Sequence, residues 1–373
     1  MSLEKVDVVI VGGGIAGCMA ALALGRQGIK VRVLEKSSQI GRNGAEFLKP
    51  RGIRILERYN LLDKLMAHQA YKRTIIRYYH QGELIITYDY QQQTALGYYM
   101  IIPYITLIQT ILDELDRLNN VTFQFSTTLK NVTITAEAEA EVVLENEHRL
   151  KTQVIIATDG RHSFIRNLFQ IPVEEGMYHQ QAYMAAFPIV PSVKDCNRLY
   201  FNNEGWGAYF YPLPPNTFRV AFIVPTTPNA VPFPDTANNL VNYLRTFVSE
   251  SEDALASIQR LDHFFKLSLT WMQAQQYTWQ NIIFLGATVL EVHPMTGQGM
   301  NVAIEDAHFV SQSLISFFEG KITLSQALTP YHTQRRLVHR TLLRYGNNLA
   351  TTYNNRDAYL DAFDFKLHGG DIN

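Results

Sequence analysis

A glycine-rich turn near the start of the chain is the first feature with a chemical role. Residues 6–11 are mainly apolar, and residues 12–17 then read G-G-G-I-A-G, which contains the pattern G-x-G-x-x-G. The pattern predicts a strand, a tight turn at Gly12 and a helix whose free N–H groups bind a diphosphate. Gly14 lets the backbone approach the diphosphate, and Gly17 lets the helix and strand pack closely. The expected diphosphate contacts are Gly12, Gly14, Ile15, Ala16 and Gly17.

An acidic residue stands where a dinucleotide-binding unit needs one. A second mainly apolar run, residues 31–34, ends at Glu35, which lies 35 − 12 = 23 residues after Gly12. A carboxylate near this spacing is typical of the group that bonds the ribose hydroxyls. Lys36 and Arg42 follow and are expected beside the cofactor. The alternative is a glycine-rich turn in an ordinary α/β fold. Glycine costs about 1 kcal/mol in a helix, however, so these glycines would destabilise the start of the helix without serving a function.

A second motif follows the strand expected over residues 154–157. Asp159 and Gly160 end that strand, and a helix is expected with Ser163 in its first turn. Asp159 is suited to cap this helix by accepting from free N–H groups. Arg166, one turn on, is expected to pair with Asp159 or to reach into a cleft. Taken alone, this stretch is an ordinary turn and helix cap, and the first motif makes Asp159 and Gly160 candidate cofactor contacts.

A third motif precedes the long helix expected over residues 298–318. Gly286 follows the strand at 281–285, and residues 293–301 then read H-P-M-T-G-Q-G-M-N. Backbone N–H groups at the start of a helix stabilise negative charge on an electron-rich ring. His293 and Pro294 are the candidates for catalysis, and a packing role for His293 stays open. The expected cofactor contacts are Gly286, Gly297, Gln298, Gly299, Met300 and Asn301.

Composition limits the classes of function. The chain has 373 residues, of which 47% are hydrophobic and 18% charged, and its formal net charge is −1. This balance predicts a well-buried globular protein and gives no reason to expect nucleic acid as a partner. The spacing of Cys18 and Cys196 indicates neither a disulfide framework nor a metal site, so we expect no metal and a reducing, cytoplasmic location. No apolar run approaches the roughly 18 residues of a membrane span, so no integral membrane segment is expected.

The order of the expected elements indicates an α/β fold in which a second sheet interrupts a Rossmann-like domain. Antiparallel strands are expected over 182–224, after a hairpin at 74–88, and long helices at 298–318 and 324–344. The 20 Tyr and 20 Phe residues either line a pocket or fill the core. The expected division is a dinucleotide-binding domain at 1–73, 98–175 and 271–320, a substrate domain at 74–97 and 176–270, and C-terminal helices at 321–373. The expected substrate contacts on the inserted strands are Tyr209, Tyr211 and Phe222.

In this order, the three motifs resemble those of the FAD-dependent aromatic hydroxylases of the para-hydroxybenzoate hydroxylase fold. That family has G-x-G-x-x-G, then D-G-x-x-S-x-x-R, then G-D followed by P-x-x-G-x-G-x-N, and the resemblance covers nearly the whole chain. It implies FAD as cofactor, a Rossmann-like FAD-binding domain and an inserted antiparallel-sheet substrate domain. The segments at 43–50, 197–200, 208–212, 293–306 and 345–349 further resemble the branch that N-hydroxylates the arylamine 2-aminobenzoylacetate.

The resemblance implies an FAD-dependent monooxygenase. Reduced flavin and O2 would form a flavin hydroperoxide that hydroxylates a small aromatic or arylamine substrate. The electrons would come from NAD(P)H that binds transiently, or from flavin reduced externally by a flavin reductase. Two alternatives stay open, namely a flavin-dependent reductase of the geranylgeranyl type and a non-catalytic, degenerate relative.

Two departures from the family pattern predict weaker cofactor binding. The G-D pair has become Gly286-Ala287, and the helix that usually begins R-x-x-L begins at Tyr104. The missing carboxylate would bond the ribityl chain of FAD. Losing one charge-assisted hydrogen bond costs about 1.5–3 kcal/mol. We therefore expect FAD to bind roughly 10- to 100-fold more weakly, unless another group compensates.

Overall fold

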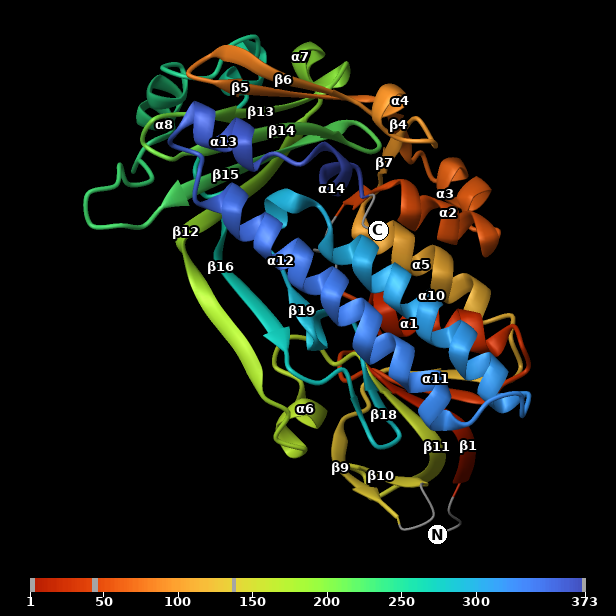
Figure 1. Cartoon of the computed structure of the whole chain (residues 1–373). Helices are drawn as coiled ribbons and strands as arrows, with labels where there is room; N and C mark the ends of the chain where they lie inside the picture. The colour runs from red at the N-terminus through yellow and green to blue at the C-terminus, as the bar shows by residue number, and fades with distance from the viewer. Residues whose placement is uncertain (1–3, 42–45, 136–138, 371–373) are drawn as a thin grey trace.

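The computed structural model describes residues 4–41, 46–135 and 139–370, over which the strands form two large sheets and one small sheet (Figure 1). One large sheet carries the glycine-rich turn, and its neighbouring core strands are all parallel. In spatial order these strands are β18 (Ile282–Phe284), β11 (Arg149–Ala157), β1 (Glu4–Val11), β2 (Val31–Leu34) and β8 (Val121–Gln124). Because the carboxyl ends of parallel strands share one edge, all three sequence motifs reach the same edge.

Antiparallel strands extend this sheet beyond β18 and along the first half of β11. They are β17 (Thr278–Trp279), β10 (Ala140–Leu144) and β9 (Leu129–Ile134). Helix α1 (Ile15–Gly25) packs against α10 (Gly299–Phe318) and α5 (Tyr104–Leu115). All 11 residues of α1 are buried, because the sheet covers one side of the helix and these two helices cover the other. The expected Rossmann-like domain is confirmed.

The second large sheet is the expected inserted sheet. In spatial order its strands are β19 (Leu290–Glu291), β16 (Phe265–Ala274), β12 (Val173–Pro188), β15 (Thr217–Pro225), β14 (Gly207–Leu213), β13 (Asn197–Phe201), β5 (Ile75–His80) and β6 (Glu83–Asp89). The expected hairpin is β5 and β6. Strands β5 and β13 are parallel, so the sheet is not antiparallel throughout as expected. The hairpin comes from a distant part of the chain, and no local turn fixes its direction.

Shorter elements join the two large sheets. The small sheet contains β3 (Phe47–Leu48), β7 (Tyr99–Ile101) and β4 (Tyr71–Arg73). The short helices are α2 (Pro50–Arg58), α3 (Leu62–Ala67), α4 (Tyr90–Gln93), α6 (Phe164–Leu168), α7 (Pro191–Lys194), α8 (Ala237–Leu244), α9 (Glu252–Ala256), η1 (Gly286–Thr288) and η2 (Pro294–Thr296).

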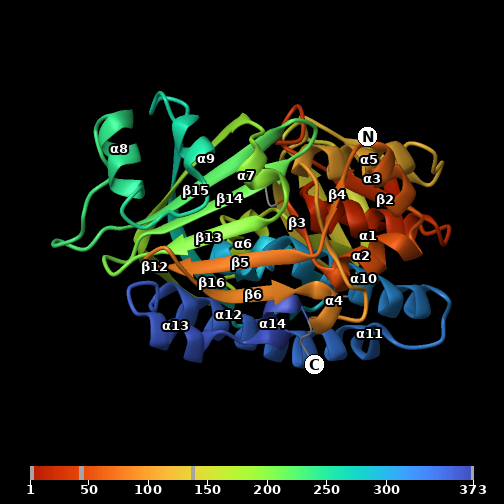
Figure 2. The same ribbon diagram turned by 90° about the horizontal axis from the view of Figure 1, so that it is seen from above.

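The C-terminal helices differ from the single helix expected over 324–344. Helix α11 (Leu324–Pro330) is followed by a π-helical turn, η3 (Tyr331–Arg335), and by α12 (Arg336–Ala350). Pro330 lacks the N–H that would continue the regular ladder, which accounts for the interruption. The chain then returns through α13 (Arg356–Ala362) and α14 (Phe365–Gly369), which end near β6 and α4 (Figure 2).

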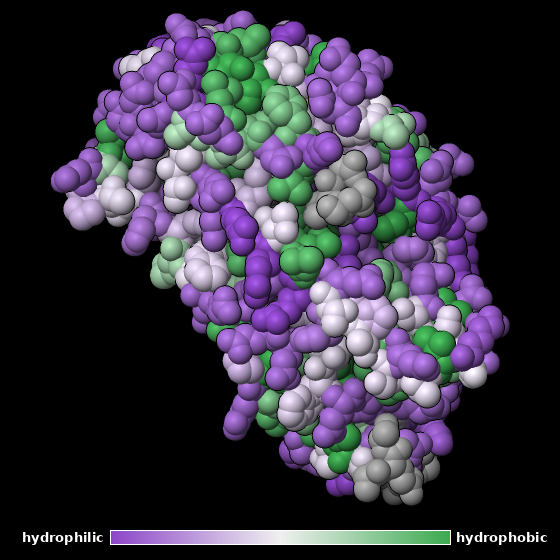
Figure 3. Space-filling model, viewed as in Figure 1, coloured by the Kyte–Doolittle hydropathy of each residue, from purple (hydrophilic) through white to green (hydrophobic). Residues whose placement is uncertain are grey.

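The face drawn in Figure 3 is largely hydrophilic, with hydrophobic residues in separate groups. Among the described residues, no helix contains a stretch that is both long enough and apolar enough to cross a bilayer.

Candidate functional site

The glycine-rich turn has the close contacts that its sequence predicts. Gly12 has φ +105°, and a β-carbon on it would lie 2.3 Å from the Thr158 carbonyl oxygen. A β-carbon on Gly17 would lie 2.2 Å from the Gly12 carbonyl oxygen, so helix and strand approach as closely as backbone allows. Gly14 starts α1 without a side-chain cap within the described ranges. The Ile15 N–H instead donates to the Tyr104 hydroxyl at 3.2 Å.

A cavity of about 370 Å³ lies beside this turn, and Glu35 forms part of its wall. One carboxylate oxygen of Glu35 accepts from the Gly13 N–H at 2.7 Å, and the other accepts from the Ser37 N–H at 2.8 Å. These bonds fix the carboxylate at the mouth of the turn. Residues from all the adjoining turns line the cavity, among them Gly12, Glu35, Lys36, Thr128, Asp159, Gly160 and His162. Arg42 lies outside the described residues.

The second motif closes the same cavity from β11. Asp159 accepts from the Ile165 N–H at 3.2 Å through Oδ2, as a cap of α6. Its Oδ1 is buried and has no hydrogen-bond partner among the described residues. A β-carbon on Gly160 would meet no atom within 4 Å, so space is open in front of the backbone. Arg166 donates to the carbonyl oxygens of Thr288 at 2.9 Å and Arg161 at 2.5 Å, and thus ties the motif to η1.

The third motif, here called the glycine loop (residues 294–301), ends at the start of α10. Gly297 has a left-handed φ of +60°, and α10 begins at Gly299 without a side-chain cap among the described residues. A β-carbon on Gly299 would meet no atom within 4 Å. The first N–H groups of a helix have no partner inside the helix. The N–H groups from Gly299 to Asn301 therefore have no partner within the helix, and they lie at the positive end of 20 helical residues, with open space at Gly299.

The side chain of Asn301 fastens the glycine loop to the start of α2. Its amide oxygen accepts from the Lys49 N–H at 2.7 Å, and its amide nitrogen donates to the Phe47 and Gly297 carbonyl oxygens at 3.0 and 2.9 Å. Gln298 is also buried, and its Oε1 has no partner among the described residues. These amides shape the loop, while its backbone is left to meet a ligand.

His293 is buried, and hydrogen bonds engage both nitrogens of its ring. Nε2 donates to the Gln180 amide oxygen at 3.0 Å, and Nδ1 accepts from the Met295 N–H at 3.4 Å. Burial lowers the pKa of His293 to about 3, so the ring is neutral at physiological pH. These contacts give His293 a positioning role for the loop. Pro294 is exposed at the start of η2, where its fixed φ suits the first position of a helix.

The two departures from the family pattern lie beside the first motif. Gly286 has φ +65°, and a β-carbon on it would lie 3.1 Å from the Ala16 Cβ, so η1 touches the start of α1. The next residue, Ala287, is exposed. Burial raises the pKa of Tyr104 to about 12, so its hydroxyl is neutral and brings no positive charge to the turn. The cavity, the free Asp159 oxygen and the open start of α10 nevertheless fit FAD.

Two of the three predicted substrate residues lie against Phe47, which is hydrogen-bonded to Asn301 of the glycine loop. The rings of Tyr209 and Tyr211, both on β14, lie 5.7 and 4.9 Å from the ring of Phe47 on β3. Phe222 on β15 pairs with Ala208, next to Tyr209, and therefore points to the opposite face of the sheet. It packs there with Phe264, at 5.5 Å between ring centroids. Because Phe222 lies on the opposite face of the sheet from Tyr209 and Tyr211, we do not keep it as a substrate contact.

A buried ion pair beside Tyr211 was not predicted from the sequence. The Tyr211 hydroxyl donates to Glu46 at 2.7 Å, and the Arg219 guanidinium donates to both oxygens of the same carboxylate. Glu46 is 6% exposed. A charged residue within the apolar strand at 217–225 was the available signal for Arg219. Glu46 had no comparable signal, because its partner is 173 residues away.

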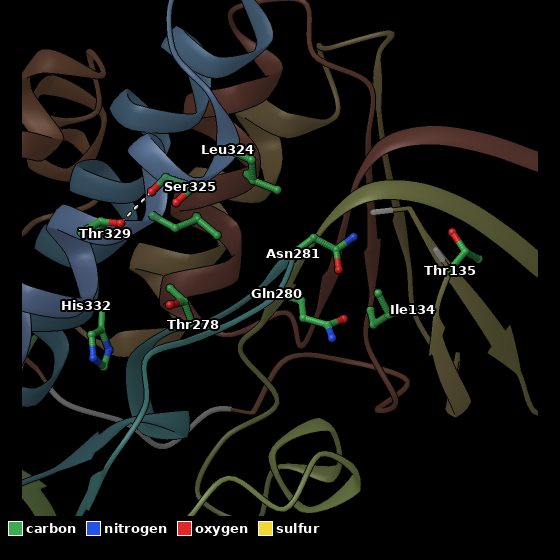
Figure 4. Close-up of a pocket in the computed structure, with 10 residues that line it drawn as sticks. Ile134, Thr135, Thr278, Gln280, Asn281, Leu324, Ser325, Thr329 and His332 are labelled. Atoms are coloured by element: carbon green, nitrogen blue, oxygen red, sulfur yellow. Dashed lines mark hydrogen bonds between the residues drawn. The ribbon is translucent and has the colours of Figure 1, made fainter. Parts of the chain in front are cut away.

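Another cavity, of about 680 Å³, lies away from these motifs (Figure 4). Thr278, Gln280 and Asn281 line one side of it, and residues of α11 such as Ser325 line the other. Gln280 and Asn281 directly precede β18 and thus lie at its amino end. Ligands of parallel α/β sheets bind at the carboxyl ends of the strands, so we assign the FAD site to the opposite edge.

Comparison with known proteins agrees with the geometry. The family described as FAD binding domain matches residues 5–345. A crystal structure of PqsL from Pseudomonas aeruginosa, a probable FAD-dependent monooxygenase, is 33% identical, with 97% of this chain and 100% of that chain covered and a TM-score of 0.92. A structure of PqsL in complex with 2-aminobenzoylacetate is 32% identical over the same shares of the two chains, with the same TM-score.

Curated relatives are more distant in sequence. The FAD-dependent monooxygenase atnA of Arthrinium sp is 25% identical over 391 residues, which cover 92% of this chain and 49% of the relative. The chain thus spans about half the length of that relative. The ubiquinone hydroxylase UbiM of Neisseria meningitidis is 22% identical over 370 residues, which cover 94% of this chain and 77% of the relative.

Proposed function

This chain belongs to the FAD binding domain family and uses FAD, and from that premise we propose that it hydroxylates a small aromatic or arylamine substrate with O2. One observation carries the proposal. The open start of α10, where charge on a flavin ring would be stabilised, lies next to the aromatic face formed by Phe47, Tyr209 and Tyr211. FAD, when reduced, supplies the electrons that activate O2 for transfer to a substrate.

The residues of this chain bind the cofactor at three points. Gly12 to Gly17 would hold the diphosphate, Glu35 the ribose, and the N–H groups of the glycine loop the ring. The domain division expected from the sequence is kept as part of this proposal. It places FAD on the parallel sheet and the substrate under the second sheet.

The aromatic face supplies a water-poor place for the substrate. Tyr211 is buried, and burial keeps its pKa well above the usual value, so its hydroxyl stays neutral and donates to Glu46. The pKa of Tyr209 is raised for the same reason. Neutral phenols and apolar rings exclude water from the substrate, and the nearby charges of Glu46 and Arg219 are paired with each other. An aromatic or arylamine ring fits this face by stacking.

An arylamine is the substrate class we favour. PqsL, whose complex contains 2-aminobenzoylacetate, shares the fold of this chain over nearly its whole length. We further propose that flavin reduced elsewhere, by a flavin reductase, is the electron donor, with transiently bound NAD(P)H as the other source. Tyr104 and Ala287 support this choice. Both are uncharged and stand where the family has charged contacts to FAD, so FAD is held loosely and exchanges readily with flavin in solution.

The test is a product screen with purified protein, pre-reduced FAD and air. Arylamines, including 2-aminobenzoylacetate, and phenols are incubated singly, and the products are analysed by mass spectrometry. The proposal expects a product that contains one added oxygen atom from at least one arylamine. If arylamines return unchanged while phenols are hydroxylated, the substrate class is revised. If no compound is oxidised although FAD binds, the proposed activity is refuted.

A further inference from the structure

The last described part of the chain, residues 363–370, is here called the C-terminal segment, and Gln298 of the glycine loop is hydrogen-bonded to it. Figure 2 shows its helix beside β6 and α4. It contains α14, whose first turn is capped by the Asp364 carboxylate. His368, Gly369 and Gly370 are buried, although terminal residues are usually poorly ordered unless they are tied down. The contacts that tie this segment down therefore indicate its role.

Three side chains from three separate elements donate hydrogen bonds to the backbone of the C-terminal segment. They come from β6, the glycine loop and the residue that starts α2. The bonds run from the Tyr88 hydroxyl to the Phe365 carbonyl oxygen at 2.9 Å, from Gln298 Nε2 to the Leu367 carbonyl oxygen at 2.7 Å, and from Lys49 Nζ to the His368 carbonyl oxygen.

Lys49 connects the C-terminal segment to the glycine loop directly. Its ammonium group also donates to the Thr296 carbonyl oxygen at 2.8 Å, and the side chain is 3% exposed. A β-carbon on Gly370 would lie 3.3 Å from the Lys49 Cβ, so the two backbones are in close contact. Burial lowers the pKa of Lys49 to about 7, because removal from water disfavours the charged form of the amine.

The side chains of the segment face the aromatic residues of the second sheet. His368 Nε2 lies 2.7 Å from the Tyr78 hydroxyl, and its Nδ1 lies 3.4 Å from the Tyr345 hydroxyl. Burial and the charge of Lys49 hold the pKa of His368 well below its usual value, so its ring is neutral. Leu367 packs against the same cluster as Tyr209. The segment thus contacts the glycine loop and packs against the cluster of side chains that includes Tyr211 and Tyr209.

We propose that the C-terminal segment is a wall of the active site, and that Lys49 is the positioning residue that fixes this wall against the glycine loop. The inference rests on the proposed function and goes beyond it. Reduced flavin and O2 that meet water without substrate yield oxidised flavin and hydrogen peroxide. A wall beside the ring therefore keeps oxygen transfer coupled to the substrate by excluding water.

The first test is hydrogen exchange in the full-length protein without FAD. Lys49→Met removes both contacts of the Lys49 amine. We expect the hydrogen-bonded amides of Gly297, Gln298, Leu367, His368 and Gly370 to exchange about ten- to a hundredfold faster, because two hydrogen bonds that hold these backbones are lost. Lys366→Met, on the exposed side of α14, is the matched control and should leave exchange unchanged. Unchanged exchange at both sites in Lys49→Met would overturn the proposal.

The second test measures the hydrogen peroxide formed per O2 consumed, with FAD, reductant and a substrate. We expect this fraction to rise severalfold in Lys49→Met and in Gly369→Ala, whose β-carbon would lie 2.3 Å from the Tyr88 hydroxyl oxygen and push the segment away. If the wild-type protein oxidises no substrate, the proposed function fails while hydrogen exchange still decides on the wall. If wild type and both variants are equally coupled, the wall is refuted.

Discussion

Replacing Glu35 by alanine is expected to weaken FAD binding about 10- to 150-fold. Each oxygen of the carboxylate already accepts one backbone N–H, from Gly13 and Ser37, and keeps a lone pair for a ribose hydroxyl. One net hydrogen bond to a charged group is worth about 1.5–3 kcal/mol, which gives this range of dissociation constants. The Gly13 N–H also loses its acceptor, so the turn itself is less well ordered in the variant.

The measurement is a titration of the apoprotein with FAD by calorimetry, with flavin fluorescence as a second signal. Glu57→Ala removes an exposed carboxylate from α2 and serves as the control for the change in net charge. FMN lacks the adenosine half, so an FMN titration should show a much smaller difference between wild type and Glu35→Ala, limited to the effect on the turn. If FAD binds the Glu35 variant as tightly as it binds wild type, the ribose is bound elsewhere and the assignment of the cavity fails.

Three further predictions concern η1, the glycine loop and His293. Ala287→Asp should tighten FAD about 10- to 150-fold if the added carboxylate bonds the ribityl chain, and equal or weaker affinity by calorimetry would show that another group fills that place. Gly299→Pro removes one N–H at the start of α10, and a helix N-terminus stabilises negative charge by about 0.3–1 kcal/mol. The variant should therefore lower the reduction potential of bound FAD. An unchanged potential in spectroelectrochemistry would show that the glycine loop has a structural role and does not stabilise the flavin ring. His293 has a pKa of about 3 when folded and about 6.5 when unfolded, so the unfolded chain alone gains a proton below pH 6.5 and stability falls. Between about pH 7.5 and 5, the titration of His293 lowers the free energy of unfolding by about 2 kcal/mol. In urea unfolding, His293→Gln should lack this part of the decrease. An equal decrease in both proteins would show that His293 is charged when folded.

The cofactor half of the site was predictable because its signals are local. The turn at Gly12, the acid at Glu35 and the cap at Asp159 depend on backbone conformations that a few neighbouring residues determine. The parallel order of β2, β1 and β11 follows from such units, because crossover connections have one hand.

The substrate half depends on pairs of residues far apart in the chain. Glu46 meets Arg219 across 173 residues, and Lys49 meets His368 across 319. No periodicity or motif encodes such pairs, and α14 is only five residues long. The opposite orientations of Tyr209 and Phe222 follow from the register between β14 and β15, which the alternation within either strand does not determine.

The most direct test of the whole account uses isotopically labelled O2. Wild-type protein, FAD reduced beforehand and 2-aminobenzoylacetate are mixed under labelled O2 in unlabelled water, and the product is analysed by mass spectrometry. The account predicts one labelled oxygen atom in the product, with less product in Glu35→Ala at limiting FAD. A product that carries oxygen from water, or substrate returned unchanged while bound reduced FAD is consumed, would contradict it.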